Sequence, residues 1–254
     1  MRHIHDREEL FKIFGQVVTI CVKDIIFQRM TKFQIACKPK HRPSEHLYVV
    51  KCVLSSLQEE KKCLIATSFD LKKFFDFEEI KDVMDSLYSN NVKHKLYRLV
   101  YNMNKNVNIK VKTPFGITES KPRGPIVTQG GVESAVISSN NVDEGLKEAF
   151  EVEEKELKYE ELIVKALSYM DDIFRMSENI ENAQYGNDAI HHMINKKNLE
   201  LNYDKSVYTI MGNKKAVSKM KQKLKESPLM IGEVVMKETS EVKYLWGFSH
   251  GRPL

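Results

Sequence analysis

Apolar residues repeat at helical spacing in several stretches of the chain. Residues 8–30 and 44–57 place such residues three and four positions apart, and Ser44 is a suitable N-terminal cap for the second stretch. The same period predicts further helices at 77–90, 93–104, 180–198 and 213–226, and one that starts at Gln129.

Short apolar runs between these helices are typical of strands. The run 64–69 ends at Asp70, the run 163–169 leads into Asp171 and Asp172, and the alternation over 107–112 predicts a strand with one basic face. Further strand candidates lie at 207–211, 229–236 and 242–248. Because strands and helices are interleaved and hairpins occur in the second half, the pattern predicts an α+β fold.

Composition narrows the class of protein. Of the 254 residues, 42% are hydrophobic, which excludes a disordered chain. No apolar run approaches the roughly 18–20 residues that a membrane-spanning helix needs, and the polar start shows no secretory signal. We therefore expect a soluble intracellular protein whose four cysteines, none of them in a C-x-x-C pair, stay reduced.

The net charge of +5 is unevenly distributed along the chain. Residues 93–123 hold eight Lys or Arg and one acid, whereas residues 143–161 hold nine acids and three Lys. A basic tract suits a polyanion such as nucleic acid, although a solvated surface gives the same pattern. We expect the basic tract to contact phosphates and the acidic segment to face away from nucleic acid.

Three carboxylates lie where strands meet turns. Asp70 follows one apolar run, and Asp171 with Asp172 forms the tip of an apolar hairpin. Carboxylate oxygens are the ligands that Mg²⁺ prefers, and a pair of such ions can clamp both reacting oxygens in phosphoryl transfer. Taken alone, an Asp-Asp dipeptide is a common turn signal, so the surrounding motifs decide between the two interpretations.

Five segments, in order, resemble the motifs of reverse transcriptases, especially those of non-LTR (LINE-type) retrotransposons. They are Phe69-Asp70-Leu71-Lys72-Lys73-Phe74-Phe75-Asp76, Gln129-Gly130-Gly131-Val132-Glu133-Ser134, Tyr169-Met170-Asp171-Asp172, Leu201-Asn202-Tyr203-Asp204-Lys205-Ser206 and Lys243-Tyr244-Leu245-Trp246-Gly247-Phe248. A weaker likeness to the family's fingers motif runs from Gln34 to Lys40, so the resemblance covers nearly the whole chain.

The resemblance implies a right-hand polymerase fold in which helices back an antiparallel palm sheet, with partial fingers and no thumb, as in a truncated fragment. Residues 1–66 would belong to the fingers and residues 67–254 to the palm, with a fingers insertion at about 93–123. The implied activity is that of an RNA-directed DNA polymerase, a nucleotidyltransferase that extends a DNA primer along an RNA template with dNTPs. Its cofactors would be two Mg²⁺ ions, for which Mn²⁺ can substitute.

The resemblance also assigns roles to single residues. Asp70, Asp171 and Asp172 would bind the metal ions, and Lys205 would give a proton to the departing pyrophosphate. Contacts with nucleotide and template would come from Leu71, Phe75, Gln129, Gly130, Lys38 and Arg42, and the primer grip from Tyr244, Leu245 and Gly247. Phe75 is equally suited to an ordinary core position beside Phe74 and Phe77.

Several positions depart from the family pattern. Two extra residues lie between Gly124 and Gln129, Ala135 replaces the usual proline, and Trp246 interrupts the primer-grip motif. These departures support a second hypothesis, a catalytically inactive relic that at most binds nucleic acid. A phosphohydrolase that uses the same carboxylates is a third, but it explains neither the motif at Gln129 nor the one at Lys205.

Overall fold

The computed structural model describes residues 9–32, 34–105, 107–124, 126–127, 130–150, 157–159, 162–164 and 166–240. The chain divides into two compact units, each made of two chain segments: residues 1–30 with 73–144, and residues 31–72 with 145–254. This division does not test the expected assignment of residues 1–66 to the fingers and residues 67–254 to the palm, which stays a prediction.

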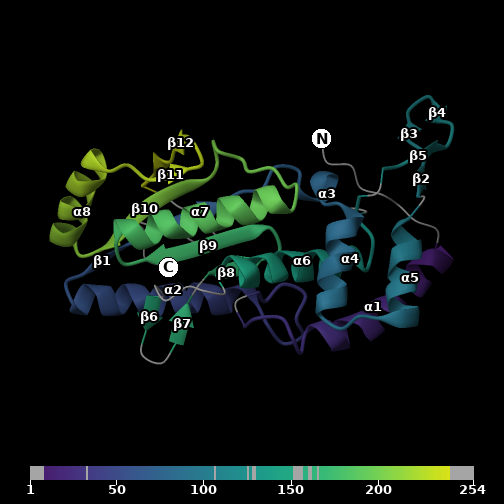
Figure 1. The fold of residues 1–254 in the computed structure, drawn as a ribbon, viewed down its shortest axis with the longest axis horizontal. Coiled ribbons are helices and arrows are strands. Elements are labelled where there is room, and N and C mark those ends of the chain that lie inside the picture. The colour runs from purple at the N-terminus through teal and green to yellow at the C-terminus, as the bar shows by residue number, and fades with distance from the viewer. Residues whose placement is uncertain are drawn as a thin grey trace. The chain divides into compact units, whose positions relative to one another are not determined.

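Helices packed around one apolar core make up most of the first unit (Figure 1). They are α1 (Glu9–Ile26), α3 (Phe74–Phe77), α4 (Ile80–Ser89) and α5 (His94–Asn104). Val22 of α1, Leu87 of α4 and Val100 of α5 are almost completely buried in this core. Burying each such side chain stabilises the fold by roughly 1.5–3 kcal/mol. The buried face of each helix must therefore be apolar, and its helical spacing is the pattern from which these helices were expected.

A small nested hairpin follows α5 (Figure 1). Its outer strands are β2 (Asn108–Ile109) and β5 (Lys121–Pro122), and its inner strands are β3 (Lys112–Thr113) and β4 (Gly116–Ile117). The continuous strand expected over 107–112 is therefore wrong, because the ladder breaks at Val111. There the backbone N–H of Val111 donates to the Thr118 hydroxyl at 2.9 Å.

The second unit is organised around a five-stranded sheet in the order β13-β10-β1-β9-β8. These strands are β1 (Cys63–Phe69), β8 (Leu167–Tyr169), β9 (Asp172–Ser177), β10 (Val207–Gly212) and β13 (Lys237–Glu238). All neighbours are antiparallel except β10 and β13, which run parallel. This exception arises because α8 (Lys214–Glu226) and the hairpin of β11 (Met230–Ile231) and β12 (Val234–Val235) carry the chain back before β13 begins.

Helices α2 (Pro43–Glu59) and α7 (Ile180–Lys196) pack on the sheet (Figure 1). Val50 and Val53 of α2 share a buried cluster with Leu64 of β1 and Phe174 of β9. Helix α7 packs on β9 and β1 through small residues that include Gly186. Successive side chains of a strand point to opposite faces of the sheet. Helices α2 and α7 therefore cover opposite faces of it. The expected α+β class, with helices backing the palm sheet, is confirmed.

Two other expectations from the sequence need correction. The helix expected from Gln129 is α6 (Ser134–Ala149), and it starts later because Gly130 has a left-handed backbone, with φ of 97°. The apolar run 163–169 is divided between β7 (Leu162–Val164), which pairs with β6 (Leu157–Tyr159), and β8. All four cysteines are free thiols, and no helix in the described part of the chain could span a membrane.

Candidate active site at one end of the palm sheet

The central strand β1 places Asp70 between its two neighbouring strands. In the β1–β9 ladder Phe69 pairs with Ile173, so one further step sets Asp70 opposite Asp172. On the other side the β1–β10 ladder ends where Ser68 pairs with Val207, and the turn before β10 brings Lys205 Nζ to 4.0 Å from Asp70 Oδ2. Antiparallel partners lie close together on the same face of a sheet. The fold thus gathers an acid, a second acid and a base from three distant segments.

A tight turn joins β8 to β9 and carries Asp171 at its tip. Tyr169 pairs with Asp172, which leaves Met170 and Asp171 as the two turn residues. Met170 has a φ of 56°, the left-handed conformation that a residue with a side chain seldom adopts. The turn therefore places two consecutive carboxylates at the sheet end where Asp70 follows β1.

The pKa of Asp172 shows that these acids influence one another. Although Asp172 retains exposed surface, its pKa is raised from 3.8 to about 6, mainly because surrounding protein desolvates the carboxylate. The negative charges of Asp171 and Asp70 raise it further. Two anions converging on a third at one sheet end form an environment that attracts cations.

The segment after α7 fixes Asp70 through its backbone and its side chain. The Asn202 side-chain amide donates to Asp70 Oδ2 at 2.9 Å, and the Asn202 N–H donates to the Asp70 carbonyl at 2.8 Å. The Asp70 N–H donates to the Ser206 hydroxyl at 3.1 Å. Lys205 Nζ lies 4.0 Å from Asp70 Oδ2, and the lysine side chain is 70% exposed. Asn202 and Ser206 belong to the same motif as Lys205, but the motif alone offers no reason to assign them this orienting role.

The donor set suits a hard divalent cation. It consists of carboxylate oxygens, which Mg²⁺ and Mn²⁺ accept, and it lacks the thiolates and imidazoles that select softer metals. Among the described residues, however, no three His, Cys, Asp or Glu side chains are placed as a ready-made metal group. The three aspartates fit such an ion by the type of their donor atoms and by their electrostatic proximity.

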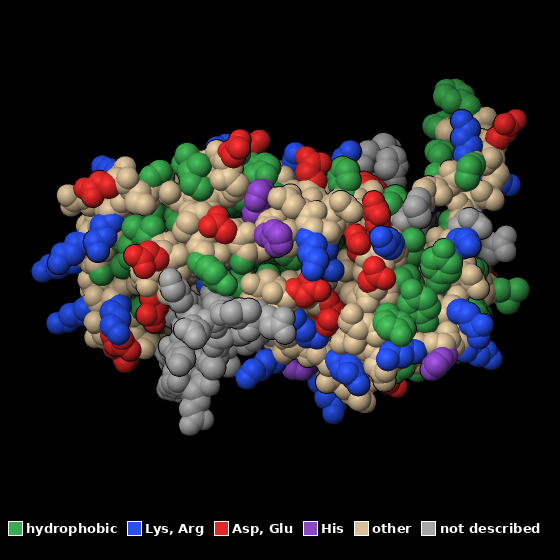
Figure 2. Space-filling model, in the orientation of Figure 1, with side chains coloured by type: hydrophobic (Ala, Val, Ile, Leu, Met, Phe, Trp, Pro, Cys, Tyr) green, Lys and Arg blue, Asp and Glu red, His purple; other side chains and the backbone are tan. Residues whose placement is uncertain are grey.

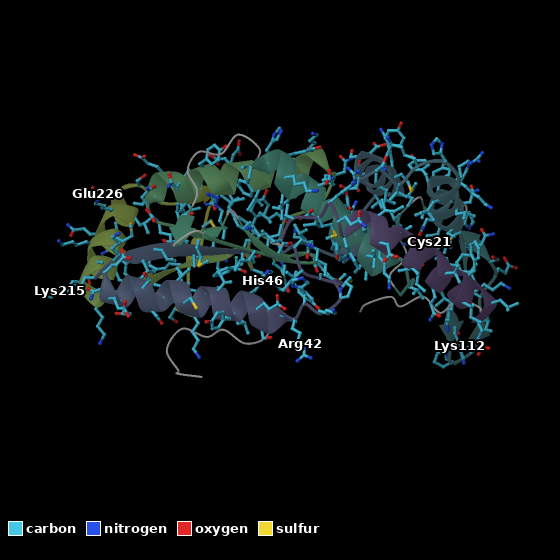
Figure 3. The ribbon with its side chains drawn as sticks, turned by 90° about the horizontal axis from the view of Figure 1, so that it is seen from below. Cys21, Arg42, His46, Lys112, Lys215 and Glu226 are labelled. Atoms are coloured by element: carbon cyan, nitrogen blue, oxygen red, sulfur yellow. The ribbon has the colours of Figure 1, made fainter. Side chains whose placement is uncertain are left out.

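Other residues expected at the site lie in the same unit. Leu71 is buried and bridges to Leu201, directly after Asp70. Arg42 caps the N-terminal end of α2, one turn before His46 (Figure 3). Because α2 and β1 run antiparallel and span about 25 and 23 Å, Arg42 returns to the sheet end that holds Asp70. Lys38 lies in the loop before α2, where its ammonium donates to the Thr31 carbonyl at 2.5 Å.

The remaining expected residues lie in the first unit or outside the described part of the chain. Phe75 and Gly130 are in the first unit, where Phe75 packs against the apolar core and edge-on to Phe74, with ring centroids 5.3 Å apart. The expected contact of Phe75 with the nucleotide stays a prediction. Gln129, Tyr244, Leu245 and Gly247 lie outside the described residues.

The sequence matches the family model described as reverse transcriptase (RNA-dependent DNA polymerase) over residues 8–248. The chain therefore belongs to the reverse transcriptase family, a family that generally uses divalent metal ions. No curated protein matches the sequence.

Solved structures of telomerase share the fold. The apo telomerase of Candida tropicalis aligns with a TM-score of 0.58 and 11% identity, covering 81% of this chain and 37% of that one. The telomerase of Candida albicans in complex with a fragment of telomeric RNA gives 0.57 and 13%, covering 80% and 34%. The corresponding Candida tropicalis complex gives 0.54 and 15%, covering 77% and 33%. The chain thus spans about a third of the length of these telomerase chains.

Proposed function

We propose that this chain catalyses RNA-templated DNA synthesis, in which a primer 3′-hydroxyl attacks the α-phosphate of a dNTP and releases pyrophosphate. The observation that carries the proposal is the convergence of Asp70 with Asp171 and Asp172 at one sheet end, across about 100 residues of sequence. Family membership supports the same conclusion, because the matched region includes all three aspartates.

In this proposal the three aspartates hold a pair of Mg²⁺ or Mn²⁺ ions between them. When bound, these ions would supply positive charge at the attacking and leaving oxygens. Asn202 keeps the Asp70 carboxylate oriented toward the site through the 2.9 Å hydrogen bond. The protein contributes positioning and charge stabilisation rather than a covalent step, as is usual for phosphoryl transfer.

Basic residues around the aspartates would bind the triphosphate and protonate the leaving pyrophosphate. Lys205 is exposed and close to Asp70, so its ammonium could donate a proton to the leaving pyrophosphate. Arg42, with Lys38 in the preceding loop, would contact the triphosphate from the fingers side. Leu71 would contribute its backbone carbonyl, Gln129 and Gly130 would contact nucleotide and template, and Phe75 would contact the sugar.

The finer assignment rests on the motifs. Their form, above all Leu201-Asn202 to Lys205-Ser206, supports a non-LTR, LINE-type parent element. In that assignment residues 67–254 form the palm, residues 1–66 with 93–123 contribute to the fingers, and Tyr244, Leu245 and Gly247 grip the primer. Because the chain spans about a third of the telomerase chains, the activity is best tested with and without a thumb domain from a related enzyme.

Replacing Asp171 by Asn tests the proposed activity directly. Asparagine preserves size and hydrogen-bonding shape but removes the charge that would hold the cations, so extension of a DNA primer on an RNA template should fall at least 10³-fold. Binding of the primer–template should stay within about twofold of wild type, because phosphate contacts come from Lys and Arg. Gel-based primer extension with Mg²⁺ or Mn²⁺ measures the first quantity and filter binding the second.

Asp188→Asn is the matched control, since Asp188 is an exposed acid on α7 in the same unit. It should extend primers at the wild-type rate. If the wild-type chain binds RNA yet extends no primer, even with a thumb supplied, the protein is an inactive relic and the proposed activity is wrong.

A further inference from the structure

Gln34 is a fully buried polar residue that lies outside every helix and named strand of the second unit. Its side-chain nitrogen Nε2 donates to the Ser168 hydroxyl at 2.8 Å and to the Met170 carbonyl at 3.3 Å. Its side-chain oxygen Oε1 accepts from the Met170 N–H at 3.2 Å and from the Ala36 N–H at 3.1 Å. All four hydrogen bonds are made by one side-chain amide with no solvent exposure.

The contacts fall on both peptide groups that flank Met170. The Met170 N–H belongs to the peptide that follows Tyr169, and the Met170 carbonyl belongs to the peptide that precedes Asp171. Two more bonds tie the same region together: the Ile35 N–H donates to the Ser168 carbonyl at 3.3 Å, and the Ser168 hydroxyl donates to the Met170 carbonyl at 3.3 Å. The loop containing Gln34 thus pairs with the end of β8 as a single parallel bridge.

These hydrogen bonds matter because the backbone conformation of the turn is intrinsically unfavourable. Met170 has a φ of 56°, and a residue with a side chain persists in this conformation when its surroundings fix it. Once both peptides around Met170 are fixed, the direction in which the next residue leaves the turn is fixed too. That residue is Asp171.

We propose that Gln34 is a positioning residue for catalysis, which holds the Met170 turn in its left-handed conformation so that Asp171 and Asp172 present their carboxylates toward Asp70. This inference rests on the proposed polymerase function, to which it adds a residue 136 positions before Met170. It predicts that Gln34, in the loop before α2, sets the geometry of the carboxylate site without touching substrate or metal.

The chain contains a matched control for this arrangement. Gln184 of α7 also holds one methionine by both backbone groups, with the Met230 N–H donating to Gln184 Oε1 at 2.8 Å and Gln184 Nε2 donating to the Met230 carbonyl at 3.2 Å. Met230 begins β11, which forms a two-stranded hairpin separate from the sheet that carries the aspartates. Gln34→Met and Gln184→Met therefore remove the same kind of contact at two different places.

Amide hydrogen exchange measured by NMR on the metal-free protein provides the direct test. Gln34→Met should speed exchange at the Met170 amide about tenfold or more, since one lost hydrogen bond is commonly worth a factor of this order. Exchange at Ile210 in β10 should remain unchanged. Gln184→Met should speed exchange at Met230 and leave Met170 as in wild type. Ser168→Ala, which removes only one hydroxyl from the network, should give a smaller increase at Met170 and provides a variant that folds if Gln34→Met does not.

Mn²⁺ binding, followed by electron paramagnetic resonance, connects the turn to the site. Gln34→Met should weaken Mn²⁺ binding by about 10–100-fold, as is typical when a residue orienting the ligands is lost. In primer extension it should lower kcat more than it raises KM for dNTP, whereas Gln184→Met should change neither.

The two sets of measurements distinguish the inference from the proposed function. Unchanged Met170 exchange in both Gln34→Met and Ser168→Ala would overturn the inference, as would equal loss of Mn²⁺ binding in Gln34→Met and Gln184→Met. If instead the wild-type protein neither binds Mn²⁺ nor extends primers, the proposed function fails, while faster Met170 exchange in Gln34→Met would still show that Gln34 holds the turn.

Discussion

At the scale of single residues, the three converging carboxylates should cost the protein stability when no cation is bound. The pKa of Asp172 is raised to about 6, so the folded state binds this proton more tightly than the unfolded chain, whose value is near 3.8. Ionisation therefore opposes folding above about pH 6, and the penalty vanishes below about pH 4. A pKa difference of about two would lower the free energy of unfolding by about 3 kcal/mol for a fully buried group. Because Asp172 is partly exposed, solvent screening reduces this penalty to about 1 kcal/mol.

Replacing Asp172 by Asn should remove that penalty. In a chelator-containing buffer at pH 7.5 we expect the melting temperature to rise by about 2–4 °C, with the gain disappearing below pH 4. Asp204→Asn is the control, because Lys237 holds the pKa of exposed Asp204 below its ordinary value. That substitution should give no gain at pH 7.5. Scanning calorimetry measures both, and a melting temperature of Asp172→Asn equal to wild type at pH 7.5 would refute the charge-repulsion argument.

The residue scale also shows what the sequence could and could not predict about the candidate site. Asp70, Asp171 and Asp172 can be located from the sequence because each lies where an apolar run meets a turn and because their motifs occur in order. Gln34 was visible only as part of a weak motif, since its partner Met170 is 136 residues away and a long-range hydrogen bond leaves no local pattern. Asn202 was likewise visible as a motif member, but its bond to Asp70 depends on strand register.

Among the elements, α7 and β9 approach closely because Gly186 faces Arg175. An added Cβ at Gly186 would overlap Nε of Arg175 and lie 2.5 Å from Nη1. Arg175 is 2% exposed, and its guanidinium carbon lies 4.9 Å from the centre of the Phe150 ring, so it has little room to move. At this position the helix can approach the strand this closely only because residue 186 carries no side chain.

Gly186→Ala should lower the free energy of unfolding by about 1–2 kcal/mol, because overpacking outweighs the gain in helix propensity. Gly145→Ala in α6 is the comparison. Its Cβ would meet the flexible ends of Lys197 and Met193, which can move aside. Urea denaturation should show a smaller loss for Gly145→Ala. An equal or greater loss there would mean that Arg175 is not the constraint.

The nested hairpin of the first unit should carry part of the nucleic-acid binding. Lys110 and Lys112 are exposed on it, and basic, hydrophobic and acidic side chains lie together on its surface (Figure 2). Replacing both lysines by Gln should weaken binding of single-stranded RNA and reduce the slope of log K against log salt concentration by about 1–1.5. Filter binding between about 50 and 200 mM salt measures this slope. Lys219→Gln with Lys223→Gln in α8 is the charge-matched control, and an equal effect there would contradict a specific role of the hairpin.

Elements with a strong hydrophobic period could be predicted from the sequence. Elements whose bounds depend on an unusual backbone conformation or hydrogen bond could not. The amphipathic helices α2, α4 and α5 and the apolar strand β1 match the sequence pattern within a few residues, because one buried face sets the period. The hairpin at 108–122 was misread because a threonine hydroxyl replaced a ladder bond at Val111. The start of α6 was misplaced because a glycine adopts left-handed φ regardless of hydrophobic pattern.

For the whole molecule, the basic hairpin and the carboxylate site belong to different compact units. The sheet end in the second unit gathers Asp70, Asp171, Asp172 and Lys205, and all four are residues of that unit. Nucleic-acid binding by the hairpin and chemistry at the aspartates should therefore respond to substitution independently. Sequence alone could not suggest this division, because each unit is assembled from two separate chain segments.

A double-mutant cycle tests that independence. Lys205→Arg keeps the charge but removes a proton that can be donated near neutral pH, so kcat for primer extension should fall about 10²–10⁴-fold. Lys110→Gln with Lys112→Gln should instead raise KM for the primer–template. If the units act separately, the combined variant should lose kcat/KM by the product of the two effects, to within about 0.5 kcal/mol. A coupling energy well above that value would mean that the hairpin also helps to set the geometry around Lys205, and steady-state kinetics at one fixed salt concentration decides between the two.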